Sequence, residues 1–308
     1  MRRRCGGGRK GCWELDTRFR PPSPCPPDPE AVRRHRQIPC LIAPAPATFG
    51  PVERGNIRKN WTRDEVILAM NLYCKLPFGQ LGHGNPDVIR LAEALGRTPS
   101  SVSMKLCNLA SFDPALQARG VGGLKAASRL DREVWDAFHA DWSGMVDRSE
   151  DLLETTLAEP TRPEPSVERF VAEMETDAWS AVKTRRGQQF FRETVLSSHN
   201  HRCCITGIAV PELLRAGHIV AWKDDIPNRL NPRNGLCLAA TQDAAFDRHL
   251  ITLDEDLRLV LSKRLRDHCT DETLRENFLR FEGQRIAAPE RFTPELAFLE
   301  RHRERCRA

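Results

Sequence analysis

The stretch from Gly217 to Asp247 constrains this chain more than any other part of it. It reads GHIVAWKDDIPNRLNPRNGLCLAATQDAAFD. His218 lies at the end of an apolar run, and an Asn-Gly pair, the strongest short turn signal, follows sixteen residues later at Asn234. A short apolar strand at 236–238 then leads into a segment that carries Asp243 and a second aspartate four residues on. The sequence therefore predicts a hairpin followed by a helix, with one imidazole, one amide and two acids on them.

Length and composition favour a soluble protein of about two domains. The chain has 308 residues, of which 29% are charged and 40% hydrophobic, and domains average roughly 150 residues. No stretch approaches the roughly 18 apolar residues of a membrane helix, and no apolar run follows the N-terminal arginines. We therefore expect a cytoplasmic location and no membrane partner.

The positive charge belongs to the N-terminal tail. The formal net charge is +5, but residues 1–55 hold eleven Lys and Arg against five Asp and Glu. The rest of the chain is therefore near neutrality, and the net charge does not by itself show that the body binds nucleic acid. The tail also holds ten of the 22 prolines, which predicts disorder. A simple extension is the favoured interpretation, and a basic arm that follows phosphates is the alternative.

The eleven cysteines form no recognisable framework. Cys203 and Cys204 are adjacent, and no C-x-x-C pair occurs. This pattern favours reduced, partly buried thiols over disulfides. A zinc site built from these two and Cys237 is a weaker alternative, because neighbouring cysteines rarely chelate one ion tetrahedrally.

Residues 56–146 show the pattern of a helical domain. Apolar residues recur at helical spacing in 61–76, with Thr62 and Glu65 as a capping box. The segments 85–96 and 97–112 each begin with a cap followed by proline. The short connection between these two segments is typical of a helix-turn-helix.

In a helix-turn-helix, the start of the second helix of the pair contacts DNA. We would then expect the polar side chains at this helix start to be exposed: Arg97, Ser100, Ser101, Ser103 and Lys105. An ordinary helical bundle with a solvated polar face is about as well supported. Residues 147–180 are acidic and contain proline, so we interpret them as a linker with some helix.

Residues 181–308 form the predicted C-terminal domain. It opens with a helix at 183–200, on which Phe190 and Phe191 share a face with Thr194 and Val195. Its basic side chains are candidates for phosphate contact, although a solvated face is equally consistent: Lys183, Arg185, Arg186 and Arg192. The run CCITGI at 203–208 predicts a short buried strand that turns at Gly207.

Several motifs, taken in their order along the chain, resemble those of a known family. The runs GQQFFRETVL, CITGI, LLRAGHIVAW, NPRNGLCL and DAAFDRHLIT, followed by FEGQRIAAPERF and FLERHR, resemble the HNH endonuclease family, within it the bacterial restriction-type proteins. The resemblance covers residues 183–303 and extends to the helical part. It implies an α+β fold: an N-terminal helical, helix-turn-helix-like domain and a C-terminal ββα-metal nuclease domain. It also implies a DNA substrate.

The resemblance assigns two catalytic residues. His218 matches the general base, which takes a proton from the water that attacks phosphorus. Asn234 matches the asparagine that braces the hairpin and orients the histidine. A satisfied core histidine and a turn asparagine are the alternative interpretations.

The last metal ligand departs from the family pattern. A histidine is expected near 242 or 243, where this chain has Gln242 and Asp243. Alignment on Phe246 and Asp247 favours Asp243 as the ligand, and a carboxylate suits Mg²⁺ or Mn²⁺. Gln242 and His249 are alternatives, and Asp247 is a candidate to complete the metal shell. Asp224 and Asp225 are further candidates.

Three hypotheses follow. The leading one is a metal-dependent DNA endonuclease of the restriction or defence type. The second is a DNA-binding protein whose HNH domain is degenerate and inactive, since Gly217 supplies no ligand before His218. The third is a structural zinc module that uses His218 and cysteines. Whether the protein forms a homodimer is left open.

Overall fold

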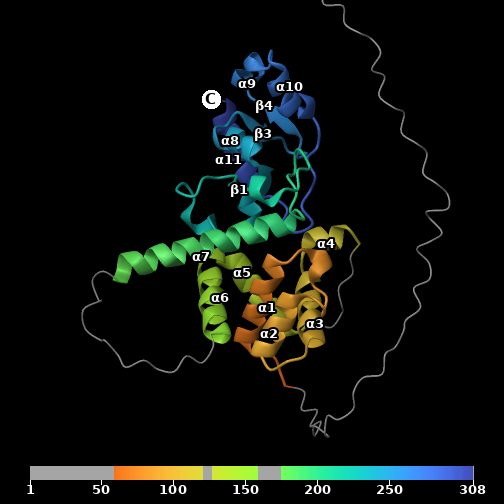
Figure 1. Ribbon diagram of the computed structural model, residues 1–308, viewed down its shortest axis with the longest axis vertical. Coiled ribbons are helices and arrows are strands. Elements are labelled where there is room, and N and C mark those ends of the chain that lie inside the picture. The colour runs from red at the N-terminus through yellow and green to blue at the C-terminus, as the bar shows by residue number, and fades with distance from the viewer. Residues whose placement is uncertain (1–58, 121–126, 159–174, 308) are drawn as a thin grey trace, which may run out of the picture. The chain divides into compact units, whose positions relative to one another are not determined.

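The computed structural model describes residues 59–120, 127–158 and 175–307, with side chains from Val182 onward in the last range. The predicted tail at 1–55 lies outside these residues. From Lys59 onward the chain clusters into one compact unit. Figure 1 shows its helices and its two small hairpins. The mostly helical first part and the later hairpins with their helices confirm the α+β fold class. The boundaries at 146 and 180 stay a prediction.

The first three helices are those that the sequence predicts. They are α1 (Arg63–Lys75), α2 (Pro86–Ala94) and α3 (Pro99–Ala110). Thr62 and Glu65 form the capping box of α1. Asn85 and Thr98 cap the other two, each followed by proline. These local signals are confirmed because a cap satisfies amide groups within its own first turn.

Three more helices complete the first part: α4 (Pro114–Ala118), α5 (Arg129–Ala140) and α6 (Trp142–Leu157). Ser128 and Asp131 form a second capping box, at the start of α5. Helix α6 supplies the helix expected within 147–180, and residues 159–174 lie outside the described parts. Short 3-10 turns occur at Phe78–Gln80, Pro211–Leu213, Ile226–Asn228, Pro232–Asn234 and Leu279–Phe281.

Helix α7 (Glu175–Ser198) contacts both the earlier helices and the first hairpin (Figure 1). Its buried face contains Phe190, Phe191, Thr194 and Val195, as predicted. Gly235 allows this helix to approach the hairpin closely. A Cβ there would lie 2.5 Å from Val195 Cγ2 and 2.8 Å from Phe191 Cζ. The glycine is thus required by packing against α7.

The first hairpin pairs β1 (Leu214–His218) with β2 (Gly235–Ala239) in antiparallel register, so that His218 faces Gly235. Helix α8 (Ala240–Asp247) follows β2 directly. The predicted hairpin-plus-helix is confirmed. A second hairpin, β3 (Ile251–Leu253) with β4 (Leu259–Leu261), leads to α9 (Lys263–His268), α10 (Glu272–Asn277) and α11 (Leu296–Arg307).

The prediction of a strand at 203–208 is wrong. This segment folds back on itself, since Cys203 N donates to Ile208 O at 2.8 Å and Gly207 N to Cys203 O at 2.9 Å. Gly207 has a φ of 75°, in the left-handed region that favours glycine. The predicted turn at Gly207 is present, but the apolar residues before it are buried in a turn.

A buried arginine joins distant parts of the chain. The Arg291 side chain is fully buried. Its guanidinium donates to the carbonyl of Tyr73, to Leu76 O at 2.5 Å and to Ser197 Oγ at 3.1 Å. These carbonyls lie at the C-terminal end of α1, where a cation is electrostatically favourable. Arg291 therefore ties the segment before α11 to α1 and α7.

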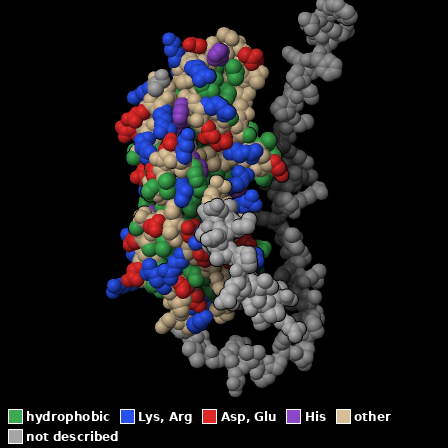
Figure 2. Space-filling view, turned by 90° about the vertical axis from the view of Figure 1, so that its left-hand side faces the viewer, with side chains coloured by type: hydrophobic (Ala, Val, Ile, Leu, Met, Phe, Trp, Pro, Cys, Tyr) green, Lys and Arg blue, Asp and Glu red, His purple; other side chains and the backbone are tan. Residues whose placement is uncertain are grey.

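Figure 2 shows one face of the molecule, on which Lys and Arg side chains are interspersed with Asp and Glu. This face therefore has no continuous band of one charge. Among the described residues, no helix combines the length and apolar character needed to cross a membrane.

Candidate active site on the first hairpin and helix α8

His218 is held in one orientation by its neighbours. Its ring stacks on Phe191 with centroids 4.0 Å apart and planes 7° apart, and it meets Trp222 edge-on at 5.5 Å. Its Nε2 lies 2.9 Å from Arg229 O. Because a carbonyl only accepts, Nε2 must carry the hydrogen in this contact. Nδ1 is then left as the nitrogen that can accept a proton.

Burial lowers the pKa of His218 below its ordinary value, and the Arg229 carbonyl and the charge of Asp247 oppose this effect. The net direction keeps the imidazole neutral near pH 7. A neutral imidazole is the form that a general base requires.

Asn234 clamps the loop that follows His218. Its Oδ1 accepts from Val220 N at 2.8 Å, and its Nδ2 donates to Val220 O at 3.1 Å and to Asn228 O at 3.4 Å. The side chain is fully buried. The amide makes no hydrogen bond to His218 itself. It holds Val220, two residues after the histidine, and Asn228, which precedes the Arg229 carbonyl that the imidazole contacts.

Asp243 faces Gly217, the residue before His218. A Cβ built on Gly217 would lie 2.5 Å from Asp243 Oδ1. That oxygen is buried and has no hydrogen-bond partner within the described residues. Burial, followed by the charge of Asp247, raises the pKa of Asp243 to about 6. The charge of Arg215 opposes this rise, but no described residue fully compensates the charge of this carboxylate.

Asp247, one helical turn after Asp243 along α8, acts electrostatically on both Asp243 and His218. Burial raises the pKa of Asp247 above its ordinary value, although the charges of His218 and Arg248 oppose this effect. Its charge also acts on Asp243 and on His218. Asp247 is therefore close enough to the imidazole and to Asp243 to interact electrostatically with each of them.

The two carboxylates of α8 have the chemistry of divalent-cation ligands. An unpartnered buried oxygen on Asp243 and a second acid on Asp247 are hard oxygen ligands, the type that Mg²⁺ and Mn²⁺ prefer. Within the described ranges no group of three or more His, Cys, Asp or Glu is arranged to hold a metal. Mg²⁺ commonly binds through one or two carboxylates and completes its shell with water and substrate phosphate.

The other candidate ligands have hydrogen-bond or ion-pair partners of their own. Gln242 is buried, and its amide donates to Asn277 O at 3.2 Å. His249 Nδ1 lies 3.1 Å from His302 Nε2. The acidic residues after β1 are paired with α11. Asp224 is paired with Arg305 at 2.6 Å, and Asp225 with Arg301 at 2.5 Å. Each of these side chains thus has a hydrogen-bond or ion-pair partner other than Asp243.

The prediction that Arg97 and Lys105 are exposed is wrong. Lys105 is 5% exposed and pairs with Asp131 at 2.6 Å. Arg97 donates to Glu65 at 2.7 Å and stacks over Trp61 at 4.1 Å. Both cations are neutralised within the helical core, so the premise for their contact with phosphate is lost. Ser100, by contrast, is exposed, while Ser101 and Ser103 are half-buried.

The basic residues of α7 differ among themselves. Arg185 is exposed. Arg186 pairs with Asp151 at 2.8 Å and Glu154 at 2.6 Å. Arg192 donates to Leu214 O at 3.1 Å, at the start of β1. Arg185 is therefore the member of this set that is best placed for a phosphate, and their contact with DNA stays a prediction.

Sequence reasoning missed the residues that position His218. Phe191 was expected only to be part of a buried face, and Arg229 contributes a backbone carbonyl that no side-chain motif reveals. Trp222 follows His218 by four residues, and its aromatic character was the one available signal.

The described cysteines at 203, 204 and 237 are free and buried. No metal-binding group includes them. This finding removes the support for the zinc-module hypothesis within the described residues.

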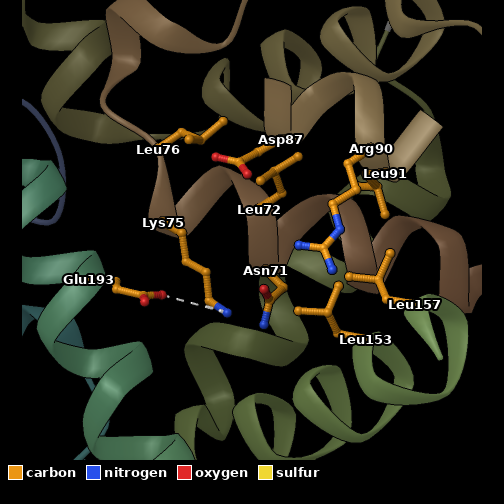
Figure 3. A pocket seen from close by; sticks show the side chains of 10 residues that line it. All are labelled: Asn71, Leu72, Lys75, Leu76, Asp87, Arg90, Leu91, Leu153, Leu157 and Glu193. Carbon is orange, nitrogen blue, oxygen red and sulfur yellow. Dashed lines mark ion pairs between the residues drawn. The ribbon is translucent and has the colours of Figure 1, made fainter. Parts of the chain in front are cut away.

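A separate cavity of about 330 Å³ lies among α1, α2, α6 and α7 (Figure 3). Leucines form much of its wall, and Lys75 points between Asn71 and Glu193. Lys75 is paired with Glu150 at 2.7 Å and Glu193 at 3.7 Å. This cavity contains none of the groups of the candidate site.

Comparison with known protein families matches residues 203–254 to the HNH endonuclease family. The matched segment contains the whole first hairpin, α8 and β3. It therefore includes His218, Asn234, Asp243 and Asp247. No curated protein matches the chain.

Proposed function

We propose that this chain, whose residues 203–254 form an HNH endonuclease domain, is a metal-dependent DNA endonuclease with His218 as its general base. The family hydrolyses phosphodiester bonds, and a nuclease domain implies a nucleic-acid substrate. Two features support the residue assignment: the buried Oδ1 of Asp243 has no partner among the described residues, and the charge of Asp247 acts on both His218 and Asp243. One phosphate can then lie between a base and a carboxylate pair.

The proposed reaction is a water attack on phosphorus. Nδ1 of His218 takes a proton from water, and the water oxygen forms a bond to phosphorus as the bond to the leaving oxygen breaks. Nε2 keeps its hydrogen bond to Arg229 O, which stabilises the imidazolium that forms. The stack on Phe191 keeps the ring from rotating away. The proton remains on the histidine until solvent removes it.

Asp243 and Asp247 would hold a divalent cation, Mg²⁺ or Mn²⁺. When bound, such an ion supplies Lewis-acid stabilisation of the charge that develops on the phosphate oxygens. The unpartnered Oδ1 of Asp243 supports this assignment. Asn234 acts as a positioning residue, because its amide fixes the loop that carries the Arg229 carbonyl.

A restriction or defence role is the finer part of the proposal, and it rests on the likeness of the motifs to restriction-type proteins. A second candidate is a DNA-binding protein with an inactive nuclease domain. The glycine at 217, which provides no ligand beside Asp243, favours it. Measured cleavage separates the two candidates.

The test uses the full chain and supercoiled plasmid with Mg²⁺ or Mn²⁺. We expect nicking or linearisation by the wild type and none with a chelator. His218→Ala should reduce the rate by about 10²–10⁴, the usual contribution of a general base. Its DNA affinity, measured without metal, should stay within about twofold because the imidazole is neutral. His83→Ala, an exposed histidine of the helical part, is the matched control.

Two further results decide between the candidates. Asp243→Ala should abolish cleavage and weaken Mn²⁺ binding measured by calorimetry. Cleavage by His218→Ala at the wild-type rate would end the assignment of the base. DNA binding with no cleavage under any divalent ion would favour the inactive-domain candidate.

A further inference from the structure

A basic groove lies beside the candidate site. It has a volume of about 600 Å³ and is formed by the end of α8, the start of α9 and the end of α11. Figure 1 shows α8, α9 and α11 in the same part of the molecule. Its charged lining consists of five basic side chains and one acid: Arg248, Lys263, Arg264, Arg305, Arg307 and Asp267. This imbalance contrasts with the mixed charges of the face in Figure 2.

Four of these cations form no ion pair within the described residues. They are all exposed: Arg248, Lys263, Arg264 and Arg307. Arg248 makes one hydrogen bond, to Ala244 O at 3.0 Å within its own helix. Arg305 is paired with Asp224 at 2.6 Å. Four exposed cations without an ion pair, gathered in one groove, favour an anionic ligand.

The walls of the groove are fixed relative to one another. Ser262 N, just before α9, donates to Leu250 O, just after α8, at 2.8 Å. His302 of α11 accepts or donates at 2.9 Å with Thr252 Oγ1 and stacks on Phe246 of α8 at 3.8 Å. The cations therefore project from a rigid frame, which reduces the entropy lost when they bind a ligand.

The groove begins where the candidate site ends. Arg248 directly follows Asp247, and Asp243 lies about one helical turn earlier, a rise of roughly 5.4 Å. One strand of DNA carries a negative charge about every 3.4 Å along the helix axis. A strand whose scissile phosphate lies at Asp243 thus brings its neighbouring phosphates towards Arg248.

We propose that this groove binds the DNA backbone next to the scissile phosphate, with Arg248, Lys263 and Arg264 as its phosphate contacts. The inference rests on the proposed function for its choice of DNA as the anion. It adds a substrate track outside the residues that the family match covers, since Lys263 and Arg264 lie beyond residue 254. The contacts are to phosphates, so they contribute affinity without sequence specificity.

The experiment measures binding of the full chain to a fluorescent duplex by anisotropy, without divalent ions so that no cleavage occurs. The test variant is Lys263→Gln/Arg264→Gln. The control is Arg275→Gln/Arg285→Gln, which removes two exposed charges outside the groove and gives the same net charge. Each protein is titrated at several salt concentrations.

We expect the groove variant to lose at least about tenfold in affinity at low salt. Its slope of log affinity against log salt should fall by about two, because each phosphate contact contributes roughly 0.9. The control should stay within about twofold. Equal affinities of the groove variant and the control would overturn the proposal, and so would groove-dependent binding of polyglutamate in the absence of any duplex binding.

Wild-type cleavage is measured in parallel. If wild type cleaves plasmid but the groove variant binds like the control, the groove assignment fails and the nuclease stands. If binding depends on the groove but wild type cleaves nothing, the groove stands and the catalytic proposal fails.

Discussion

Gly217 and Asp243 face each other so closely that a Cβ on the glycine would lie 2.5 Å from Asp243 Oδ1. The absence of a side chain at Gly217 leaves room for this buried oxygen. The same oxygen lacks a partner within the described residues. The two residues are 26 positions apart in the chain, and their close approach requires a glycine at position 217.

Gly217→Ala should therefore impair cleavage without unfolding the protein. The added methyl group would push the Asp243 carboxylate from its position, and we expect at least a tenfold loss of rate, equal to about 1.4 kcal/mol. The thermal midpoint should fall by less than about 4 °C, because the end of a flexible side chain can move. Gly79→Ala, where a Cβ meets nothing within 4 Å, is the control. Unchanged cleavage by Gly217→Ala would remove Asp243 from the site.

The sequence predicted features that depend on neighbouring residues. The capping box of Thr62 and Glu65 is local, and so is the proline after Asn85. The order of hairpin and helix α8 followed from the apolar pattern around His218. The caps were predictable because their hydrogen bonds close within a few residues, and the hairpin because its strands show an apolar pattern.

Features that depend on distant partners were not predictable. Lys105 was expected at the surface, but it is buried because Asp131, 26 residues later, neutralises it. The segment 203–208 has the apolar character of a strand, yet Gly207 turns it before it can pair as one. The stack of His218 on Phe191 joins residues 27 apart, and no local pattern encodes it.

The pH dependence of cleavage should have a steep acid limb. His218 must be neutral, and burial lowers its pKa; Asp243 must be ionised, and burial raises its pKa to about 6. Both groups lose a proton to become active, so the rate should rise with pH. At limiting metal the slope of log rate should approach about two below the lower of the two pKa values.

Saturating metal should reduce this slope towards one. A bound cation favours the ionised carboxylate, so Asp243 no longer titrates in this range. Rates at a series of pH values and two Mn²⁺ concentrations check this outcome. A rate that falls as pH rises from 5 to 7 would contradict both assignments.

Asn234→Ala should destabilise the protein as well as impair cleavage. The substitution leaves the buried N–H and C=O of Val220 without their side-chain partner, which costs about 1–3 kcal/mol for each unsatisfied group. We therefore expect a loss of several °C in the thermal midpoint. Asn277→Ala removes an amide with one local hydrogen bond, to Thr273 O, and should cost less than about 1 kcal/mol. Equal effects of the two substitutions would show that Asn234 does not brace the loop.

Acid should destabilise the fold through two buried histidines. Burial lowers the pKa of His199 and that of His302 to about 4, against an ordinary value of 6.5. Between these pH values the unfolded chain binds more protons than the folded one, so stability falls as pH decreases. The stability that each neutral histidine contributes is fully present above about pH 6.5 and is lost as the pH falls towards about 4. Lowering the pH from 7 to 5 should reduce the free energy of unfolding by about 2 kcal/mol for each histidine.

Urea denaturation at pH 7 and pH 5 measures this loss, and His302→Gln isolates one contribution. The variant is less stable at pH 7, since it loses hydrogen bonds to Thr252 and Phe246. Its further loss at pH 5 should be about 2 kcal/mol smaller than that of the wild type, because glutamine does not titrate. His83→Gln, an exposed position, should leave the pH dependence unchanged. If His302→Gln and wild type lose equal stability between the two pH values, His302 is not held neutral by burial.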